Sequence, residues 1–191
     1  MSKPRALVAL TLLLTAGAAV AHPGHEAMSF ASGLSHPLGG FDHLLAMLAV
    51  GLFAARQQGV ARWALPAGFV AAMLGGAALS TSGIELPAVE AGIATSVLVF
   101  GLLIAFAARL PLAAAMPLIS VFALFHGHAH HAEMGSNTLL TYTAGFTLAS
   151  AALHGVGYLA ARHLPDSRFG KYAQRAIGMT IAGAGVLLIG A

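Results

Sequence analysis

Long apolar segments separated by short polar connections dominate this chain. After residue 35, six segments of roughly 20 residues each are almost continuously hydrophobic, near 36–55, 63–81, 86–108, 111–132, 138–161 and 172–190. A helix rises about 1.5 Å per residue, so about 20 residues are enough to cross the hydrocarbon core of a bilayer. The segments do not alternate between polar and apolar residues as the strands of a membrane barrel do. The pattern predicts an all-α, polytopic membrane bundle with six transmembrane helices.

The first 21 residues have the pattern of a cleavable signal peptide. Lys3 and Arg5 precede an apolar core, and the small residues at 19 and 21 match a cleavage site. The alternative is an uncleaved first membrane helix, for which the apolar run is short. Cleavage would leave a mature chain, 22–191, that forms a single transmembrane domain and begins outside the cytoplasm.

Composition agrees with a membrane protein and argues against other classes. The 191 residues are 58% hydrophobic and 8% charged, whereas soluble domains average about 25% charged residues. The absence of cysteine excludes disulfides and thiolate metal sites. The basic residues are spread singly, which argues against a nucleic-acid partner despite the net charge of +3. Stretches rich in Gly and Ala, such as 68–76 and 181–185, predict close helix packing, within one bundle or between copies in a homo-oligomer.

The basic residues predict which side of the membrane each connection faces. If the mature chain starts outside and crosses the membrane six times, every Lys and Arg after residue 21 falls on the inner side. The residues that fall at or near the outer side include Glu26, Glu85, Glu90 and Glu133. This distribution agrees with the positive-inside rule. It predicts a multi-pass protein of the bacterial cytoplasmic membrane with both mature termini in the periplasm.

Two polar clusters interrupt the apolar pattern, one near the start of the first segment and one near the end of the fourth. Their members are His36, Asp42 and His43 in the first cluster, and His126, His130 and Glu133 in the second. The second set is spaced i, i+4, i+7, which is one stripe of a helix. Antiparallel threading places both clusters about 10 Å below the outer surface, at a rise of about 1.5 Å per residue. The two clusters are therefore predicted to meet.

Ionisable side chains at membrane depth are costly, and they usually mark ion pathways, relays or ligand sites. Imidazole and carboxylate without thiolate suit divalent Ni, Co, Zn or Cu, whereas Ca and Mg prefer oxygen ligands alone. Asp42 would either bind the metal or fix the tautomer of a histidine that does. The alternative is that Asp42 and one histidine pair only with each other and lock two helices together.

Further side chains are candidates for secondary metal contacts, with ordinary packing or solvation as the alternative for each. They are His22, His25, Met47, His128, His131 and His154. The first two, with His128 and His131, would gather metal at the outer surface, and His154 lies in the inner half of the fifth helix. Hydroxyls in the third and fifth helices, among them Ser96, Thr143 and Thr147, either bond back to their own helix or line a polar path. The sequence leaves both interpretations open.

The two clusters together resemble the motifs of the HupE/UreJ family of nickel/cobalt permeases, which are associated with nickel hydrogenases and ureases. The first family motif is His, five residues, Asp-His, and it is matched by His36, Asp42 and His43. The second motif, Phe-His-Gly-x-Ala-His-Gly-x-Glu, is matched over 125–133 except that His131 replaces the second glycine. The resemblance covers essentially the whole mature chain. It implies a secondary transporter, not an enzyme, with Ni(II) or Co(II) as substrate and no permanently bound cofactor.

Two other functions stay open on the residues alone. An integral-membrane, metal-dependent (zinc) hydrolase would also gather His and Asp near one membrane face, with Glu133 as the general base. A non-transporting metal-binding accessory protein would need only the site. No nucleotide-binding motif is present in the sequence, so this chain is not expected to hydrolyse ATP itself.

Overall fold

The computed structural model describes residues 29–132 and 139–190, and these form an all-α bundle. The helices are α2 (Phe30–Gly39), α3 (Phe41–Ala54), α4 (Ala61–Thr81), α5 (Val89–Ala105), α6 (Leu112–Ala132), α7 (Leu139–Arg162) and α8 (Arg168–Ile189). No strand occurs in the described part of the chain, so the all-α part of the predicted fold class is confirmed. The predicted signal peptide lies outside the described residues.

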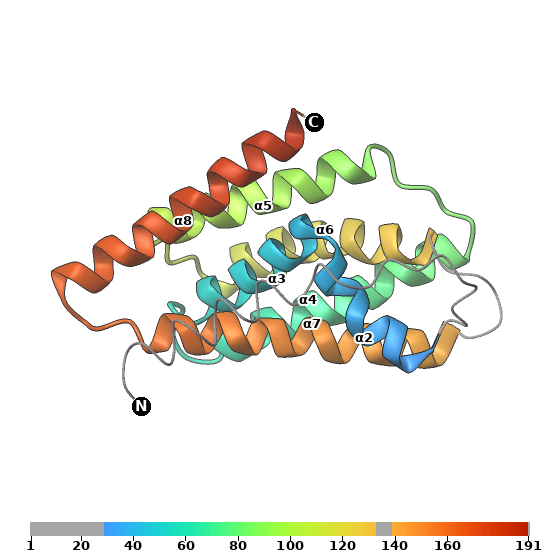
Figure 1. The fold of residues 1–191 in the computed structure, drawn as a ribbon, viewed down its shortest axis with the longest axis horizontal. Coiled ribbons are helices and arrows are strands. Elements are labelled where there is room, and N and C mark those ends of the chain that lie inside the picture. Colours follow the sequence, from blue (N-terminus) through green and yellow to red (C-terminus); the bar gives the residue numbers. More distant parts are fainter. Residues whose placement is uncertain (1–28, 133–138, 191) are drawn as a thin grey trace.

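Successive helices from α3 onward run in opposite directions, as Figure 1 shows. The α3–α4, α5–α6 and α7–α8 connections therefore gather at one end of the bundle, on the left in that view. These connections and the helix ends beside them carry Arg56, Arg62, Arg109, Arg162 and Arg168. The basic residues thus share one end of the molecule. The predicted direction of that end, toward the cytoplasm, stays a prediction.

The described helices coincide with the six apolar segments, but they differ in their ability to cross a membrane. Four are individually long and apolar enough: Ala61–Thr81, Leu112–His130, Leu140–Arg162 and Arg168–Ile189. The bent pair α2 and α3 gives a fifth if it is counted as one span, and Val89–Ala105 is a shorter apolar helix. Large apolar side chains on the bundle surface, such as Leu140 and Leu187, are 84% and 75% exposed. The fold is that of a membrane protein, and six complete spans stay a prediction.

The first apolar segment is two helices, which corrects the expectation of a single helix entered at His36. α2 already begins at Phe30, before the first apolar segment, which was predicted to begin near residue 36. It begins there because Ser29 and Ser32 form a capping box, in which the Ser32 N–H donates to Ser29 Oγ (3.1 Å) and the Ser29 N–H donates to Ser32 Oγ (2.8 Å). At Gly40 the backbone is extended, and α2 and α3 meet at an angle of 88°.

Glycines set the closest helix contact between α3 and α7. A Cβ atom on Gly51 would collide with the carbonyl oxygen of His154, and one on Gly157 would collide with that of Leu48. Each helix therefore needs a glycine where the other helix's backbone passes, and small residues allow such close approach between membrane helices.

The same device joins α4 to α6. A Cβ atom on Gly76 would collide with the carbonyl oxygen of Leu124, and one on Gly127 would collide with that of Met73. The small residues that the sequence showed in 68–76 thus pack one helix on another within the chain. This crossing also fixes α6 at the point where its histidines begin.

Candidate functional site

Four imidazoles from three helices meet inside the bundle, and we call them the histidine cluster: His36 from α2, His43 from α3, and His126 and His130 from α6. The ring centroids of His43 and His130 are 3.9 Å apart, and those of His43 and His126 are 4.4 Å apart. His36 approaches His130 from the other side, at 4.6 Å between centroids. The structure therefore brings together two sequence motifs that lie more than 80 residues apart.

The bend at Gly40 brings His36 into the cluster. It turns α2 so that this short helix lies against α7, where a Cβ atom on Gly33 would collide with the carbonyl oxygen of Tyr142. The ring of His36 packs beside that of Tyr142, with centroids 5.7 Å apart. His36 is thus held by contacts with α7 as well as by its place in the sequence.

Asp42 stands in the first turn of α3 and orients His43. Its Oδ1 atom accepts a hydrogen bond from the backbone N–H of His43 (2.7 Å) and lies 3.2 Å from Nδ1 of the same ring. A carboxylate at Nδ1 favours the tautomer that carries its proton there, which leaves the Nε2 lone pair available. The Nε2 atom of His43 is buried and has no hydrogen-bond partner among the described residues. These contacts fit one of the two predicted roles of Asp42, that of fixing the tautomer of a histidine, and metal binding stays a prediction.

Ser96 on α5 does the same for His126, which is fully buried. Ser96 Oγ donates to the carbonyl oxygen of Ile93 (2.7 Å) and lies 2.8 Å from Nε2 of His126. Since the hydroxyl proton is used by Ile93, the oxygen is placed to accept from an Nε2–H, which leaves Nδ1 unprotonated. The sequence offered Ser96 only as one of several hydroxyls. The sequence could have indicated this pairing only through depth. Ser96 lies about 10 Å from the start of α5, at a rise of about 1.5 Å per residue, and His126 was predicted to lie at a similar depth below the outer surface.

Four ring nitrogens of the histidine cluster are buried without a hydrogen-bond partner in the described part of the chain. They are Nε2 of His43, Nδ1 of His126, and both nitrogens of His130. Buried polar atoms are nearly always paired, so unpaired ones at one place point to a ligand or to water. The rings pack edge to face, and no group of three or more His, Asp or Glu side chains among the described residues is arranged to hold a metal ion as it stands. Shared coordination would therefore require the rings to turn.

His128 does not join the cluster, although it lies between two of its members. It is buried, and its Nε2 lies 3.0 Å from the carbonyl oxygen of Ile84 and 3.3 Å from the backbone nitrogen of Leu86. The ring therefore ties α6 to the α4–α5 connection. These backbone groups enclose the ring, so it is not exposed at the surface as predicted, and a metal contact by His128 stays a prediction.

The remaining predicted residues either pack inside the bundle or lie outside the described side chains. Met47 is fully buried in the apolar core of the bundle. His154 on α7 is 3% exposed, neither of its ring nitrogens has a described partner, and its ring centroid lies 5.2 Å from that of Phe69. The predicted residues whose side chains are not described are His22, His25, His131 and Glu133.

The fold and the site define a class, that of a helical membrane protein which encloses a cluster of imidazoles beside one carboxylate. The model of the HupE / UreJ protein family matches residues 10–188. The chain is also 42% identical over 183 residues to Protein HupE from Rhizobium leguminosarum bv. viciae, across 95% of this chain and 93% of that protein. This chain therefore belongs to the HupE / UreJ family, as its two motifs indicated. No solved structure matches it significantly.

Proposed function

We propose that this chain is a secondary permease that carries Ni(II) or Co(II) inward across the bacterial cytoplasmic membrane. The observation that carries the proposal is the histidine cluster, in which buried ring nitrogens from two helices have no hydrogen-bond partner among the described residues. Neutral imidazole is a good ligand for these borderline divalent ions. The HupE/UreJ resemblance, which implies nickel or cobalt uptake, supports the same substrate class.

The proposed roles follow from what holds each ring. Asp42 holds Nδ1 of His43 and Ser96 holds Nε2 of His126, so the opposite nitrogen of each ring is left for the ion. His130 lies against both His36 and His43, so it connects the ring from α2 with the ring from α3. Glu133, one turn beyond His130 along the sequence, would add a second carboxylate. His22 and His25 would collect metal at the outer surface.

A site made mainly of neutral ligands also suits release of the ion. An ion is conducted when its site binds it well enough to admit it and weakly enough to let it leave. The described cluster contains four imidazoles and one carboxylate, and the chain has no thiolate to hold a soft metal tightly. The site therefore favours exchange of the ion over permanent storage.

Radioactive nickel accumulation in cells tests the site. His43→Ala and His126→Ala are each expected to lower accumulation at least tenfold with unchanged protein in the membrane, because each removes an unpartnered ligand nitrogen. His163→Ala is the matched control, since His163 is exposed and its Nδ1 lies 2.8 Å from the carbonyl oxygen of Leu159, far along the chain from the cluster. Wild-type accumulation in both cluster variants would contradict the proposal.

Reconstitution separates transport from binding alone. Purified protein in proteoliposomes with Ni, Co or Zn gradients is expected to give flux that His43→Ala abolishes. Metal bound without flux would instead identify a non-transporting binding protein. Hydrolysis that depends on a tightly bound stoichiometric zinc ion would identify the membrane hydrolase.

A further inference from the structure

One face of α7 carries a row of polar side chains through the apolar bundle. Thr143, Thr147, Ser150 and His154 are spaced i, i+4, i+7, i+11, which forms one continuous stripe on a helix. Ser150 is fully buried and His154 is 3% exposed, so the stripe faces the interior of the bundle there. We call these four residues the α7 stripe.

Two hydroxyls of the stripe, those of Thr147 and Ser150, differ from the hydroxyls of Thr81 and Thr180 elsewhere in the described residues. In membrane helices Ser and Thr ordinarily bond back to a carbonyl of the preceding turn. Thr81 and Thr180 do this, with bonds of 2.8 Å and 3.0 Å to the carbonyls of Ala77 and Ala176. Thr147 Oγ1 and Ser150 Oγ, in contrast, are buried and have no hydrogen-bond partner in the described part of the chain. Their local bond is available in the helix and is not made, so these oxygens are left for another ligand.

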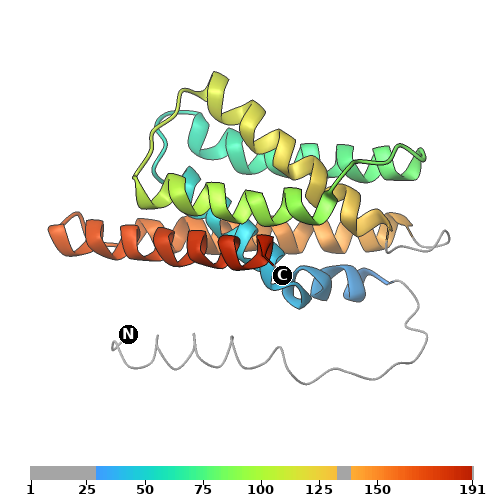
Figure 2. The ribbon, with the colours of Figure 1, turned by 90° about the horizontal axis from the view of Figure 1, so that it is seen from above.

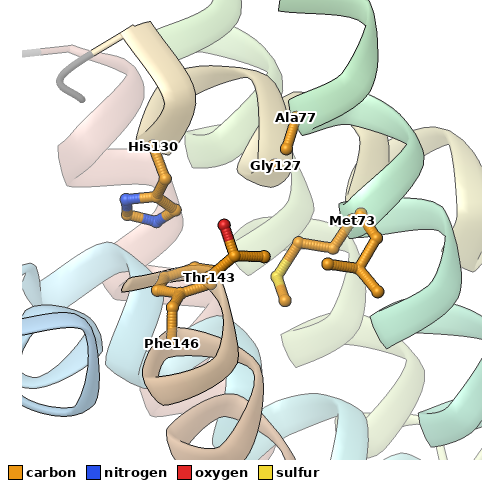
Figure 3. A pocket seen from close by; sticks show the side chains of 7 residues that line it. Met73, Ala77, Gly127, His130, Thr143 and Phe146 are labelled. Atoms are coloured by element: carbon orange, nitrogen blue, oxygen red, sulfur yellow. The ribbon is translucent and has the colours of Figure 1, made fainter. Parts of the chain in front are cut away.

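The stripe begins beside the histidine cluster. A small cavity between α4, α6 and α7 is lined by His130 and Thr143 together with Met73 and Phe146. Figure 3 shows the Thr143 hydroxyl and the His130 ring at this cavity, with the Met73 thioether approaching from α4. The outer end of the stripe therefore shares a space with a cluster imidazole whose two nitrogens have no described partner.

The stripe ends at a second imidazole nearer the basic end of the bundle. His154 precedes the last two turns of α7, which ends at Arg162. Both ring nitrogens of His154 are buried without a described partner. The stripe thus connects two sets of ring nitrogens by two hydroxyls, and none of these atoms has a hydrogen-bond partner among the described residues.

We infer that the α7 stripe is the route along which the divalent cation leaves the histidine cluster, with the hydroxyls of Thr147 and Ser150 and the ring of His154 as successive contacts. Neutral oxygen and nitrogen atoms can replace parts of the hydration shell of the ion without trapping it by charge. Apolar side chains in place of these residues would interrupt the series of polar contacts along the route. The inference rests on the proposed function and adds a route to its site.

Substitutions that keep shape and remove polarity test the route. In proteoliposomes, Thr147→Val combined with Ser150→Ala is expected to lower the maximal rate of nickel uptake at least fivefold and to change the half-saturating concentration less than twofold, because the entry site is intact. Thr180→Val is the matched control, since Thr180 is exposed on α8 and bonds to its own helix. An unchanged maximal rate in the double variant, with wild-type uptake intact and His43→Ala inactive, would overturn the route and leave the proposed function standing.

An ion-sized probe gives a second measurement that does not depend on those variants. Because the chain has no cysteine, Ser150→Cys would carry a single thiol. Cadmium is expected to inhibit nickel uptake by Ser150→Cys at concentrations at least tenfold below those that inhibit the wild type. Ala151→Cys, at an exposed position one residue along α7, is expected to keep wild-type sensitivity. Equal sensitivity of Ser150→Cys, Ala151→Cys and the wild type would overturn the inference.

Discussion

The α3–α7 and α4–α6 crossings are built in the same way but carry different side chains. In both crossings, the glycine of each helix faces a backbone carbonyl of the other helix. On every helix, the residue with that carbonyl lies three positions before the helix's own glycine. Those carbonyls belong to Leu48 on α3 and Leu124 on α6, and to His154 on α7 and Met73 on α4. The close approach of the helices requires only the glycines. The residue that supplies the facing carbonyl can therefore carry any side chain. One crossing holds an imidazole and the other a thioether at the same relative place.

The likeness extends to the third pair of helices. α5 and α8 lie side by side (Figure 2), and Cβ atoms on Gly101 and Gly178 would collide with the backbone nitrogens of Ala182 and Ala105. The packing thus matches α3 with α6, α4 with α7 and α5 with α8, and the members of the first two matched pairs run in opposite directions (Figure 1). This is the arrangement of inverted repeats in many transporters. The two halves share their packing, whereas the histidine cluster and the α7 stripe break the likeness.

The strongest test of the likeness is to crowd both crossings equally. Gly51→Ala and Gly127→Ala are each expected to destabilise the protein, since each new methyl group would collide with a backbone carbonyl of the partner helix. Overpacking of this kind costs about 1–3 kcal/mol. Unfolding of the purified protein in detergent measures the loss. A loss at only one crossing would show that the two are not equivalent.

The difference between the crossings is tested by exchanging their side chains for leucine. His154→Leu is expected to lower nickel uptake about tenfold, which corresponds to about 1.4 kcal/mol in the barrier, because it removes the last polar contact of the α7 stripe. Met73→Leu conserves volume and is expected to stay within about twofold of the wild type, as such swaps are tolerated well. Equal loss of uptake in both, at equal protein levels, would contradict the distinction between them.

The smallest expected effect comes from a glycine that makes no crossing. Gly155 lies on α7 between His154 and Gly157, and a Cβ atom there would meet no atom within 4 Å. Gly155→Ala is therefore expected to stabilise the protein by about 0.5–1 kcal/mol, because alanine loses less backbone freedom than glycine when a helix forms. The same unfolding measurement checks it. Destabilisation similar to that of Gly51→Ala would mean that the space around each glycine does not decide the outcome.

Hydrophobic pattern predicted the helices well and the shape of the first one poorly. The fourth segment was expected over 111–132 and is Leu112–Ala132, because an apolar run bounded by polar connections fixes both ends of a helix. The proximity of the histidines followed from antiparallel threading. The bend at Gly40 was not predicted, because hydropathy does not record backbone direction, although the capping serines at 29 and 32 were visible in the sequence.

Side-chain partners were the least predictable part. Helical periodicity placed His128 on a different stripe from His126, but it did not show that the backbone of the α4–α5 connection would enclose the ring. In the same way, the unpartnered hydroxyls of Thr147 and Ser150 look like any other Ser and Thr in the sequence. Such features depend on the neighbouring helix, which a single periodic pattern does not describe.

The 88° bend at Gly40 means that the first two members of the histidine cluster come from two helices that meet nearly at a right angle. Along a straight helix, the seven residue steps from His36 to His43 would span about 10 Å at a rise of about 1.5 Å per residue. In the bent segment both rings touch His130, at 4.6 Å and 3.9 Å between centroids. One continuous segment of chain therefore contacts the His130 ring from two directions. The distance between the His36 and His43 rings is therefore set by the backbone angles of a single residue, Gly40.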